Sequence, residues 1–291
     1  MKRANQVNQE IIDLFDEYTH TALARRDFFK KLVLLAGGTA AATALLPILE
    51  SNYAKAVMVA EDDPQLSTET ITYPGAGGEM MGYLARPKNA SGDLPKVIVI
   101  HENRGLTAHI QDVVRRVALE GYEALGADFL SIAGGTPKDE DRARELIGAL
   151  DAQQTLGNLM ATLAFLQSRG ASKVGCVGFC WGGAMTNQLA VNAPDLGAAI
   201  AFYGLVPPVE DVPKIQSPLL LHYAGLDERI NQGIPGYEAA LRAGGKDYTL
   251  CMYGKVNHAF HNDTSEARYD ANAAQLAWER SIAFFDYYLK A

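Results

Sequence analysis

The sequence predicts an α/β fold with a mostly parallel central sheet and helices on both faces. After about residue 66, short and continuous apolar runs alternate with segments of helical periodicity. Strands that are apolar throughout are typical of a sheet buried on both faces, and alternation with helices is typical of parallel strand order. One cysteine between glycines directly follows such a run, as at a turn between a strand and a helix. The predicted body, residues 57–291, has the length of one such domain.

The elements of the body follow from its hydrophobic pattern. "TETITYP" and "GEMMGYLARP", with "GAGG" at their junction, predict a β-hairpin. Apolar runs predict six further strands, at residues 96–102, 122–129, 173–179, 197–204, 218–225 and 248–254. Helical periodicity predicts helices at 109–120, 142–168 and 266–289. In sheets of this kind ligands bind at the carboxyl ends of the strands, so the site is expected there.

The first 56 residues resemble a twin-arginine export signal. "ARRDFFK" places Arg25 and Arg26 before the moderately apolar "KLVLLAGGTAAATALLPIL". The "AKA" at residues 54–56 is a small-residue cleavage site. We therefore predict an N-terminal arm and export signal over residues 1–56, the export machinery as a partner, and a periplasmic location. No stable membrane insertion is expected after cleavage.

Retention of this arm is the alternative, either as a membrane anchor or in the cytoplasm. The apolar stretch is about long enough to cross a bilayer, although its glycines, its threonines and Pro47 weaken that interpretation. Apolar residues that precede the arginine pair recur at helical spacing: Val7, Ile11, Leu14, Phe15 and Tyr18. They indicate an amphipathic helix that packs on a neighbouring surface.

Charge and cysteine content exclude several classes of partner and site. The chain has 34 acidic and 26 basic residues, a net charge of −8, which would repel nucleic acid and anionic membranes. Cys176, Cys180 and Cys251 form neither a CxxC motif nor metal-type pairs. We expect no disulfide framework, no metal and no organic cofactor. A homo-oligomer is compatible with the composition.

The segment "VGFCWGGA" (177–184) is typical of a nucleophile elbow. It follows a predicted strand, precedes a helix-compatible stretch, and has glycines on both sides of the turn. Such a strained turn exposes its central side chain, here Cys180, at a helix start whose dipole favours a thiolate. The alternative, a buried structural cysteine, is assigned to Cys176 and Cys251, which lie inside strands.

Two residues at later strand ends are candidates for the rest of a catalytic triad. Asp227 follows "PLLLHYAG", and His258 follows the last strand in "GKVNHAFHN". The order nucleophile, acid, histidine is that of the α/β-hydrolase fold, and all three positions fall at one edge of the predicted sheet. His261 is the alternative base, and we favour His258 because it comes first after the strand.

Four segments of the body resemble the dienelactone hydrolase family. They are "VIVIHENRGL", "VGFCWGGA", "AGLDERI" and "NHAFHN". The resemblance covers the chain from about residue 66 onward. It implies a carboxymethylenebutenolidase-like hydrolase of carboxylic esters or lactones, with a small-molecule substrate. The catalytic triad that the resemblance implies is Cys180, Asp227 and His258, and the reaction passes through an acyl-thioester.

The same resemblance implies supporting residues around the thiol. In the family a glutamate after the first long strand contacts the resting thiol, and Glu102 matches it. The backbone amides of Trp181 and Asn103 would form the oxyanion hole, which stabilises charge on the carbonyl oxygen during attack. For Glu102 a salt bridge to Arg104 is the alternative.

The sequence departs from the family where a substrate carboxylate would bind. The family has an arginine four positions after the catalytic histidine, and Asn262 stands there. A second arginine would correspond to Arg142 or Arg144, although "DEDRARE" is equally a solvated helix face. We therefore do not expect an anionic dienelactone. Phe179, Trp181 and Tyr203 predict an apolar or aromatic acyl pocket, to which Arg144 would add a charge.

Two functions of other classes remain as alternatives. The first is a non-catalytic binding or scaffold protein on an α/β-hydrolase fold, because a fold alone does not establish activity. The second is a thiol-redox protein that uses Cys180, for which the sequence offers no evident resolving cysteine.

Overall fold

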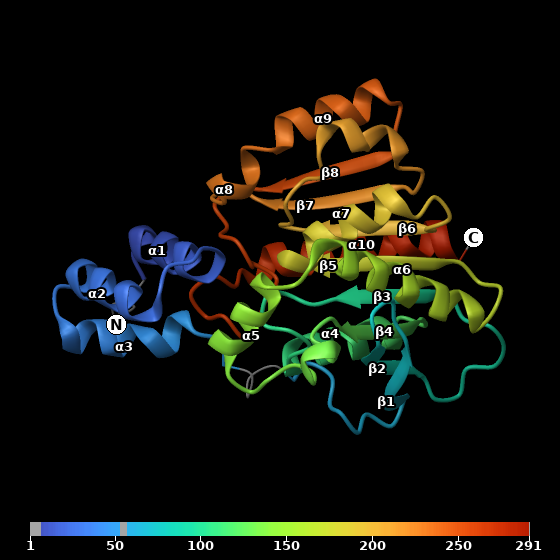
Figure 1. Cartoon of the computed structure of the whole chain (residues 1–291), viewed down its shortest axis with the longest axis horizontal. Coiled ribbons are helices and arrows are strands. Elements are labelled where there is room, and N and C mark those ends of the chain that lie inside the picture. Colours follow the sequence, from blue (N-terminus) through green and yellow to red (C-terminus); the bar gives the residue numbers. More distant parts are fainter. Residues whose placement is uncertain (1–6, 53–56, 291) are drawn as a thin grey trace.

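The computed structural model describes residues 7–52 and 57–290. The predicted cleavage site at residues 54–56 lies outside them. The described chain forms a central eight-stranded sheet with its covering helices. A separate group of three helices comes from the N-terminal segment, residues 7–52. Figure 1 shows this group beside the sheet.

The sheet has the predicted character, antiparallel at one edge and parallel elsewhere. Its strands are β1 (Leu66–Pro74), β2 (Glu79–Pro87), β3 (Lys96–Ile100), β4 (Glu123–Asp128), β5 (Val174–Phe179), β6 (Ala198–Phe202), β7 (Leu219–Ala224) and β8 (Tyr248–Tyr253). Their order is β1-β2-β4-β3-β5-β6-β7-β8. β1 and β2 form the predicted hairpin, β2 also pairs antiparallel with β4, and all the other pairs are parallel.

Helices cover both faces of the sheet, which confirms the predicted fold class. α4 (Ala108–Leu119) and α10 (Ala271–Leu289) contact one face. α6 (Ala152–Ser168), α7 (Trp181–Asn192) and α9 (Ile234–Ala243) cover the other. In β3, Val97 and Val99 join the first core cluster while Ile98 and Ile100 join the second. This division explains why the strand is apolar throughout.

One predicted helix is divided in two. The segment 142–168 contains the end of α5 (Glu140–Gly148) and all of α6. Asp151 lies between them, and its side chain accepts a hydrogen bond from the Gln154 amide, so it caps a new helix. The remaining short elements are η2 (Ser131–Ala133), η3 (Val209–Lys214) and α8 (Glu228–Asn231).

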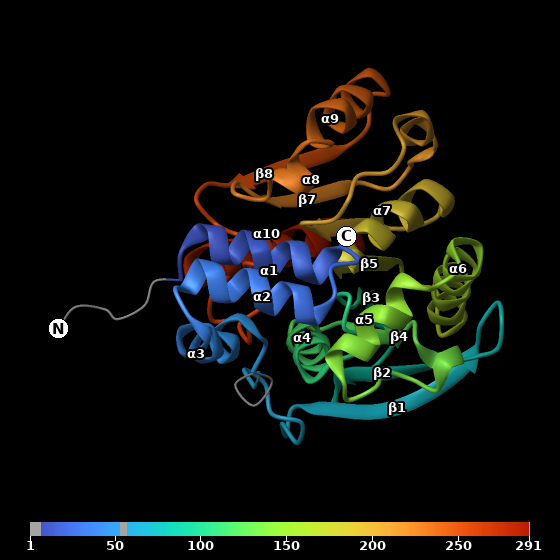
Figure 2. The same ribbon diagram turned by 60° about the vertical axis from the view of Figure 1, so that its left-hand side comes forward.

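The N-terminal segment folds into α1 (Gln9–His20), α2 (Arg25–Ala36) and α3 (Thr39–Leu49). Its apolar cluster contains four of the residues whose spacing indicated an amphipathic helix: Ile11, Leu14, Phe15 and Tyr18. In Figure 1 the three helices lie on the side toward which the parallel strands point, and in Figure 2 α1 and α2 lie in front of that edge. The segment therefore covers the edge at which a ligand site is expected.

The arginine pair and the apolar stretch have defined places in this segment. Arg25 begins α2 and forms ion pairs with Glu50 and, on α5, Asp141, each at 2.8 Å. No single helix in the described chain is long and apolar enough to cross a membrane. α2 and α3 pass that test only together, and the chain bends by 113° between them. Export through this signal stays a prediction.

Candidate active site

Cys180 occupies a strained turn between β5 and α7. Its backbone has φ 55° and ψ −113°, a conformation that non-glycine residues rarely adopt. The turn is held by a hydrogen bond from the Cys180 amide to the Phe202 carbonyl at 3.0 Å. Gly182 packs its Cα against β3, where an added Cβ would lie 2.3 Å from the Ile100 carbonyl oxygen. The glycine is therefore required by the close approach of the helix start to the neighbouring strand.

Replacing Gly182 with alanine should destabilise the fold and reduce activity. The methyl group must push the start of α7 away from β3, an overpacking that costs about 1–3 kcal/mol of unfolding free energy and moves Cys180. Gly254→Ala is the matched control, because an added Cβ there meets no atom within 4 Å. Denaturant midpoints and kcat/KM check the prediction. A Gly182→Ala protein as stable and active as Gly254→Ala would contradict it.

His258 and Asp227 form a buried pair beside this turn. The His258 Nδ1–H donates to Asp227 Oδ2 at 2.5 Å, so Nε2 is the ring atom available on the other side. That Nε2 is buried and makes no hydrogen bond within the described part of the chain. Burial alone lowers the pKa of the imidazole, but the negative charges of Asp227, of Cys180 in its thiolate form and of Asp16 outweigh it and raise the pKa to about 9. The pair therefore favours an imidazolium at neutral pH.

The other histidines of the body lie elsewhere. His261 packs between Phe179 and Phe202, and burial lowers its pKa well below the usual value. His222 is a core residue bonded to Tyr253 and Ser281. His258, and not His261, is therefore the histidine that is hydrogen-bonded to the Asp227 carboxylate.

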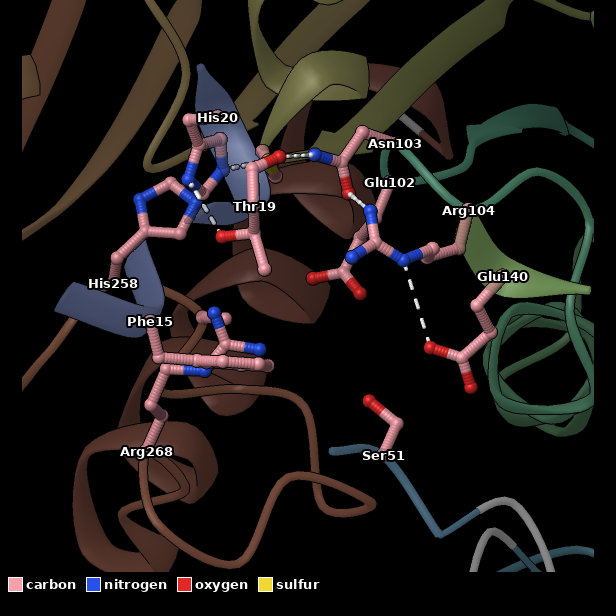
Figure 3. A pocket seen from close by; sticks show the side chains of 12 residues that line it. Phe15, Thr19, His20, Ser51, Glu102, Asn103, Arg104, Glu140, His258 and Arg268 are labelled. Atoms are coloured by element: carbon pink, nitrogen blue, oxygen red, sulfur yellow. Dashed lines mark hydrogen bonds and ion pairs between the residues drawn. The ribbon is translucent and has the colours of Figure 1, made fainter. Parts of the chain in front are cut away.

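His20, at the end of α1, is the hydrogen-bond partner of the thiol. Its Nε2 lies 3.1 Å from the Cys180 Sγ, and its ring meets that of His258 edge-on, with centroids 4.6 Å apart. Figure 3 shows the two imidazoles side by side, with Thr19 to their right and Phe15 below them. Sequence reasoning missed His20 because it assigned residues 1–56 to an export signal. The amphipathic pattern of α1 indicated that the helix packs on something, but not on what.

Glu102 is held away from its predicted partners. Its Oε2 accepts a hydrogen bond from the Asn262 side chain at 2.6 Å, while Arg104 pairs with Glu140 at 3.5 Å. The thiol contact implied for Glu102 is made instead by His20. Asn262, which stands where the family has an arginine, thus orients a half-buried carboxylate.

The two predicted oxyanion-hole residues border the thiol. Trp181 is the first residue of α7, where an amide N–H has no intrahelical acceptor. Asn103 follows β3 and lines the same hollow as Cys180 and His258. Its side chain donates to the Thr19 carbonyl at 2.7 Å, which ties the loop to α1.

A cavity of about 790 Å³ opens on Cys180. Trp181, Tyr203 and His258 line it from the body, and residues 19–24 line it from the N-terminal segment. Phe179 does not belong to the pocket wall as predicted: it is fully buried and stacks on Phe202 at 4.8 Å. It shares the strand face of Val177, which alternation directs into the core.

Arg144 also lines this cavity, but its guanidinium group is already bound by Tyr18 of the N-terminal segment. The group lies over the Tyr18 ring, 4.3 Å from the centroid, and donates to the Tyr18 carbonyl. The predicted alternative, Arg142, is exposed and pairs with Glu145 at 3.2 Å.

Three donor atoms at the centre of the site form the kind of set that a metal ion takes. The Cys180 Sγ and one ring nitrogen each of His20 and His258 lie within 4.8 Å of one another. Thiolate and imidazole are ligands that Zn²⁺ prefers. A bound ion would occupy the sulfur that a nucleophilic mechanism needs.

Two family models match the sequence. The dienelactone hydrolase family matches residues 80–289, and a model described as YqhI-like matches residues 1–36. The second match ends with α2 and therefore includes His20 and the arginine pair.

Relatives and solved structures match the same body. A "Putative carboxymethylenebutenolidase" of Escherichia coli O157:H7 is 33% identical over 255 residues, which covers 82% of this chain and 93% of the relative. A protein of the same name from Methylorubrum extorquens is 30% identical over 95% of this chain and 97% of its own length. A crystal structure titled "Putative Dienelactone Hydrolase", from Klebsiella pneumoniae, superimposes with a TM-score of 0.71 at 32% identity, and it covers 77% of this chain and 99% of that one. The match to the Methylorubrum protein covers a larger share of this chain than residues 57–291 make up, so it also includes part of residues 1–56.

Proposed function

Because the chain belongs to the dienelactone hydrolase family, we propose that it hydrolyses a carboxylic ester or lactone through an acyl-thioester on Cys180. The observation that carries the proposal is the strained turn that sets Cys180 beside the buried His258–Asp227 pair. A nucleophile, a base and a group that orients the base are the parts that covalent hydrolysis needs.

The roles of the residues follow from the charges that develop. The Cys180 thiolate attacks the carbonyl carbon, and the backbone amides of Trp181 and Asn103 stabilise the resulting oxyanion by a few kcal/mol each. The His258 imidazolium protonates the leaving alcohol. The neutral ring then takes a proton from water, which attacks the thioester and releases the acid.

The substrate we propose is neutral and largely apolar. Arg144 is held by Tyr18, and Asn262 is bonded to Glu102, so neither supplies a free cation for a substrate carboxylate. Trp181, Leu205 and Leu150 contribute apolar surface to the 790 Å³ cavity. Arg229, another cation on this cavity, is paired with Asp16 at 3.5 Å, so an anionic acyl group would have to compete with a carboxylate of the protein for that charge, which is costly.

A panel of esters and lactones tests the function on the full chain. p-Nitrophenyl butyrate and p-nitrophenyl hemisuccinate have similar acyl length and differ in a terminal carboxylate. We expect turnover of the neutral ester, with kcat/KM at least about tenfold higher than for the anionic one. Simple neutral lactones should also be opened. Failure to hydrolyse any ester or lactone would overturn the proposal in favour of a scaffold protein.

A further inference from the structure

We infer that His20, oriented by Asp16, is a catalytic residue of this hydrolase: it accepts the proton of the Cys180 thiol. The inference deepens the proposed function and rests on it for the later steps. It makes the N-terminal segment, residues 7–52, a part of the active site.

The segment is bonded to several loops around the site. Asn103, after β3, donates to the Thr19 carbonyl, and Gln9 donates to the Asn257 side chain after β8 at 2.6 Å. The Tyr18 hydroxyl donates to Asp141 on α5. These contacts hold both ends of α1 on the body, so the position of His20 is determined by the body as much as by its own helix.

The hydrogen bonds of His20 determine which of its nitrogens can accept a proton. Nδ1 lies 2.9 Å from the Asp16 carbonyl oxygen, which can only accept, and 3.1 Å from Asp16 Oδ1. Nδ1 therefore carries the hydrogen, and Nε2 presents its lone pair to the Cys180 Sγ at 3.1 Å. The thiol is thus the donor in this contact.

Asp16 is built to remain ionised beside His20. Burial alone would raise the pKa of its carboxyl, but His258, His20 and Arg268 hold it well below the usual value. Arg229 and Arg268 face it at 3.5 and 4.0 Å. Asp16 resembles Asp227 in placing a carboxylate beside an imidazole, but it orients His20 through a hydrogen bond to its backbone carbonyl and an ion pair at 3.1 Å. Two imidazoles, each beside an aspartate, thus converge on one sulfur.

The two histidines divide the proton transfers between them. The S–H bond of Cys180 breaks as an N–H bond forms at His20 Nε2, which leaves a thiolate and an imidazolium balanced by Asp16. His258, whose Nε2 makes no hydrogen bond to any residue that the structure describes, protonates the leaving alcohol and later takes a proton from water. When the thioester C–S bond breaks, the sulfur recovers its proton from His20. At the end of the cycle Cys180, His20 and His258 are each in the protonation state in which they began.

The segment leaves room for a substrate. Residues 19–24 form one wall of the 790 Å³ cavity, and Cys180 and His258 remain on its lining. A segment that only blocked the thiol would fill this space. The inference therefore predicts that the active form retains the N-terminal segment.

Full-chain His20→Ala and His20→Gln test the inference by two readouts. The first is the iodoacetamide alkylation rate of Cys180, located by peptide mass spectrometry and independent of any substrate. The second is kcat/KM for p-nitrophenyl butyrate. Both should fall on the order of 10²-fold, because a general base is lost. Added imidazole should restore much of the rate of His20→Ala. Lys30→Ala, an exposed change in α2, is the control and should behave as wild type.

The other outcomes are equally informative. Faster alkylation and turnover in His20→Ala would show that the segment blocks Cys180, which overturns the inference. Unchanged rates, or a loss that imidazole cannot restore, would leave His20 a structural residue and also overturn it. If the wild type hydrolyses no ester but alkylation still falls in both variants, the proposed function fails while the thiol–His20 proton transfer stands. His20→Gln supplies the alkylation result should His20→Ala not fold.

Discussion

Cys180→Ala is expected to lose ester hydrolysis almost completely, with kcat/KM reduced on the order of 10⁴- to 10⁶-fold. The change removes the sulfur on which the proposed acyl intermediate forms. Stability should change little, because Cys180, although buried, borders a cavity and alanine keeps its Cβ. Steady-state kinetics, with a thermal melt as the test of folding, check both expectations.

The other two cysteines provide matched controls. Cys176 is buried in β5, and burial raises the pKa of its thiol to about 12, so it is inert at neutral pH. Cys251 lies half-buried in β8, away from the site. Cys251→Ala should keep wild-type kinetics. Loss of activity in Cys251→Ala, or retention in Cys180→Ala, would remove Cys180 from the mechanism.

Asp227→Asn should reduce kcat/KM on the order of 10³- to 10⁴-fold with the fold retained. The carboxylate is the nearest charge that favours the His258 imidazolium and fixes its tautomer. Asn preserves a second role of the residue, since Asp227 Oδ1 caps α8 by accepting from the Ile230 amide at 3.2 Å. The kinetic loss should therefore appear in a protein that is still folded, which near-UV circular dichroism can check. Wild-type rates in Asp227→Asn would contradict the assignment.

The same substitution has a distinct effect on the pH dependence of stability. The pKa of His258 is about 9 in the folded chain and about 6.5 when unfolded. The folded state thus binds the proton more tightly, and this stabilisation is fully present below about pH 6.5 and is lost as pH rises to about 9. Removing the charge of Asp227 lowers the folded pKa. Denaturant unfolding should therefore show a shallower decline between pH 6.5 and 9 in Asp227→Asn than in wild type.

The fold and the body's part of the site were predictable because their signals are local. Apolar runs specify the strands, and the glycines around Cys180 are demanded by the turn itself. Asp227 and His258 could be placed because parallel strands bring their carboxyl ends to one edge. Phe179 was misplaced because proximity to the nucleophile suggested the pocket, whereas strand alternation turns its ring into the core.

The contribution of the N-terminal segment was not predictable by the same reasoning. Its docking depends on contacts such as Asn103 with Thr19 and Tyr18 with Asp141, which are 84 and 123 residues apart in sequence. No local pattern specifies such pairs. A single histidine beside an apparent export signal gives no sign that it meets a thiol 160 residues later.

Trapping the acyl-enzyme tests the central claim most directly. Full-chain protein, mixed with a slowly deacylated p-nitrophenyl ester and quenched in acid within one turnover, should gain the mass of one acyl group. Peptide mapping should place that group on Cys180, and Asp227→Asn should accumulate it more slowly. Turnover of the ester with no acyl group on Cys180, or with the group on another residue, would contradict the account.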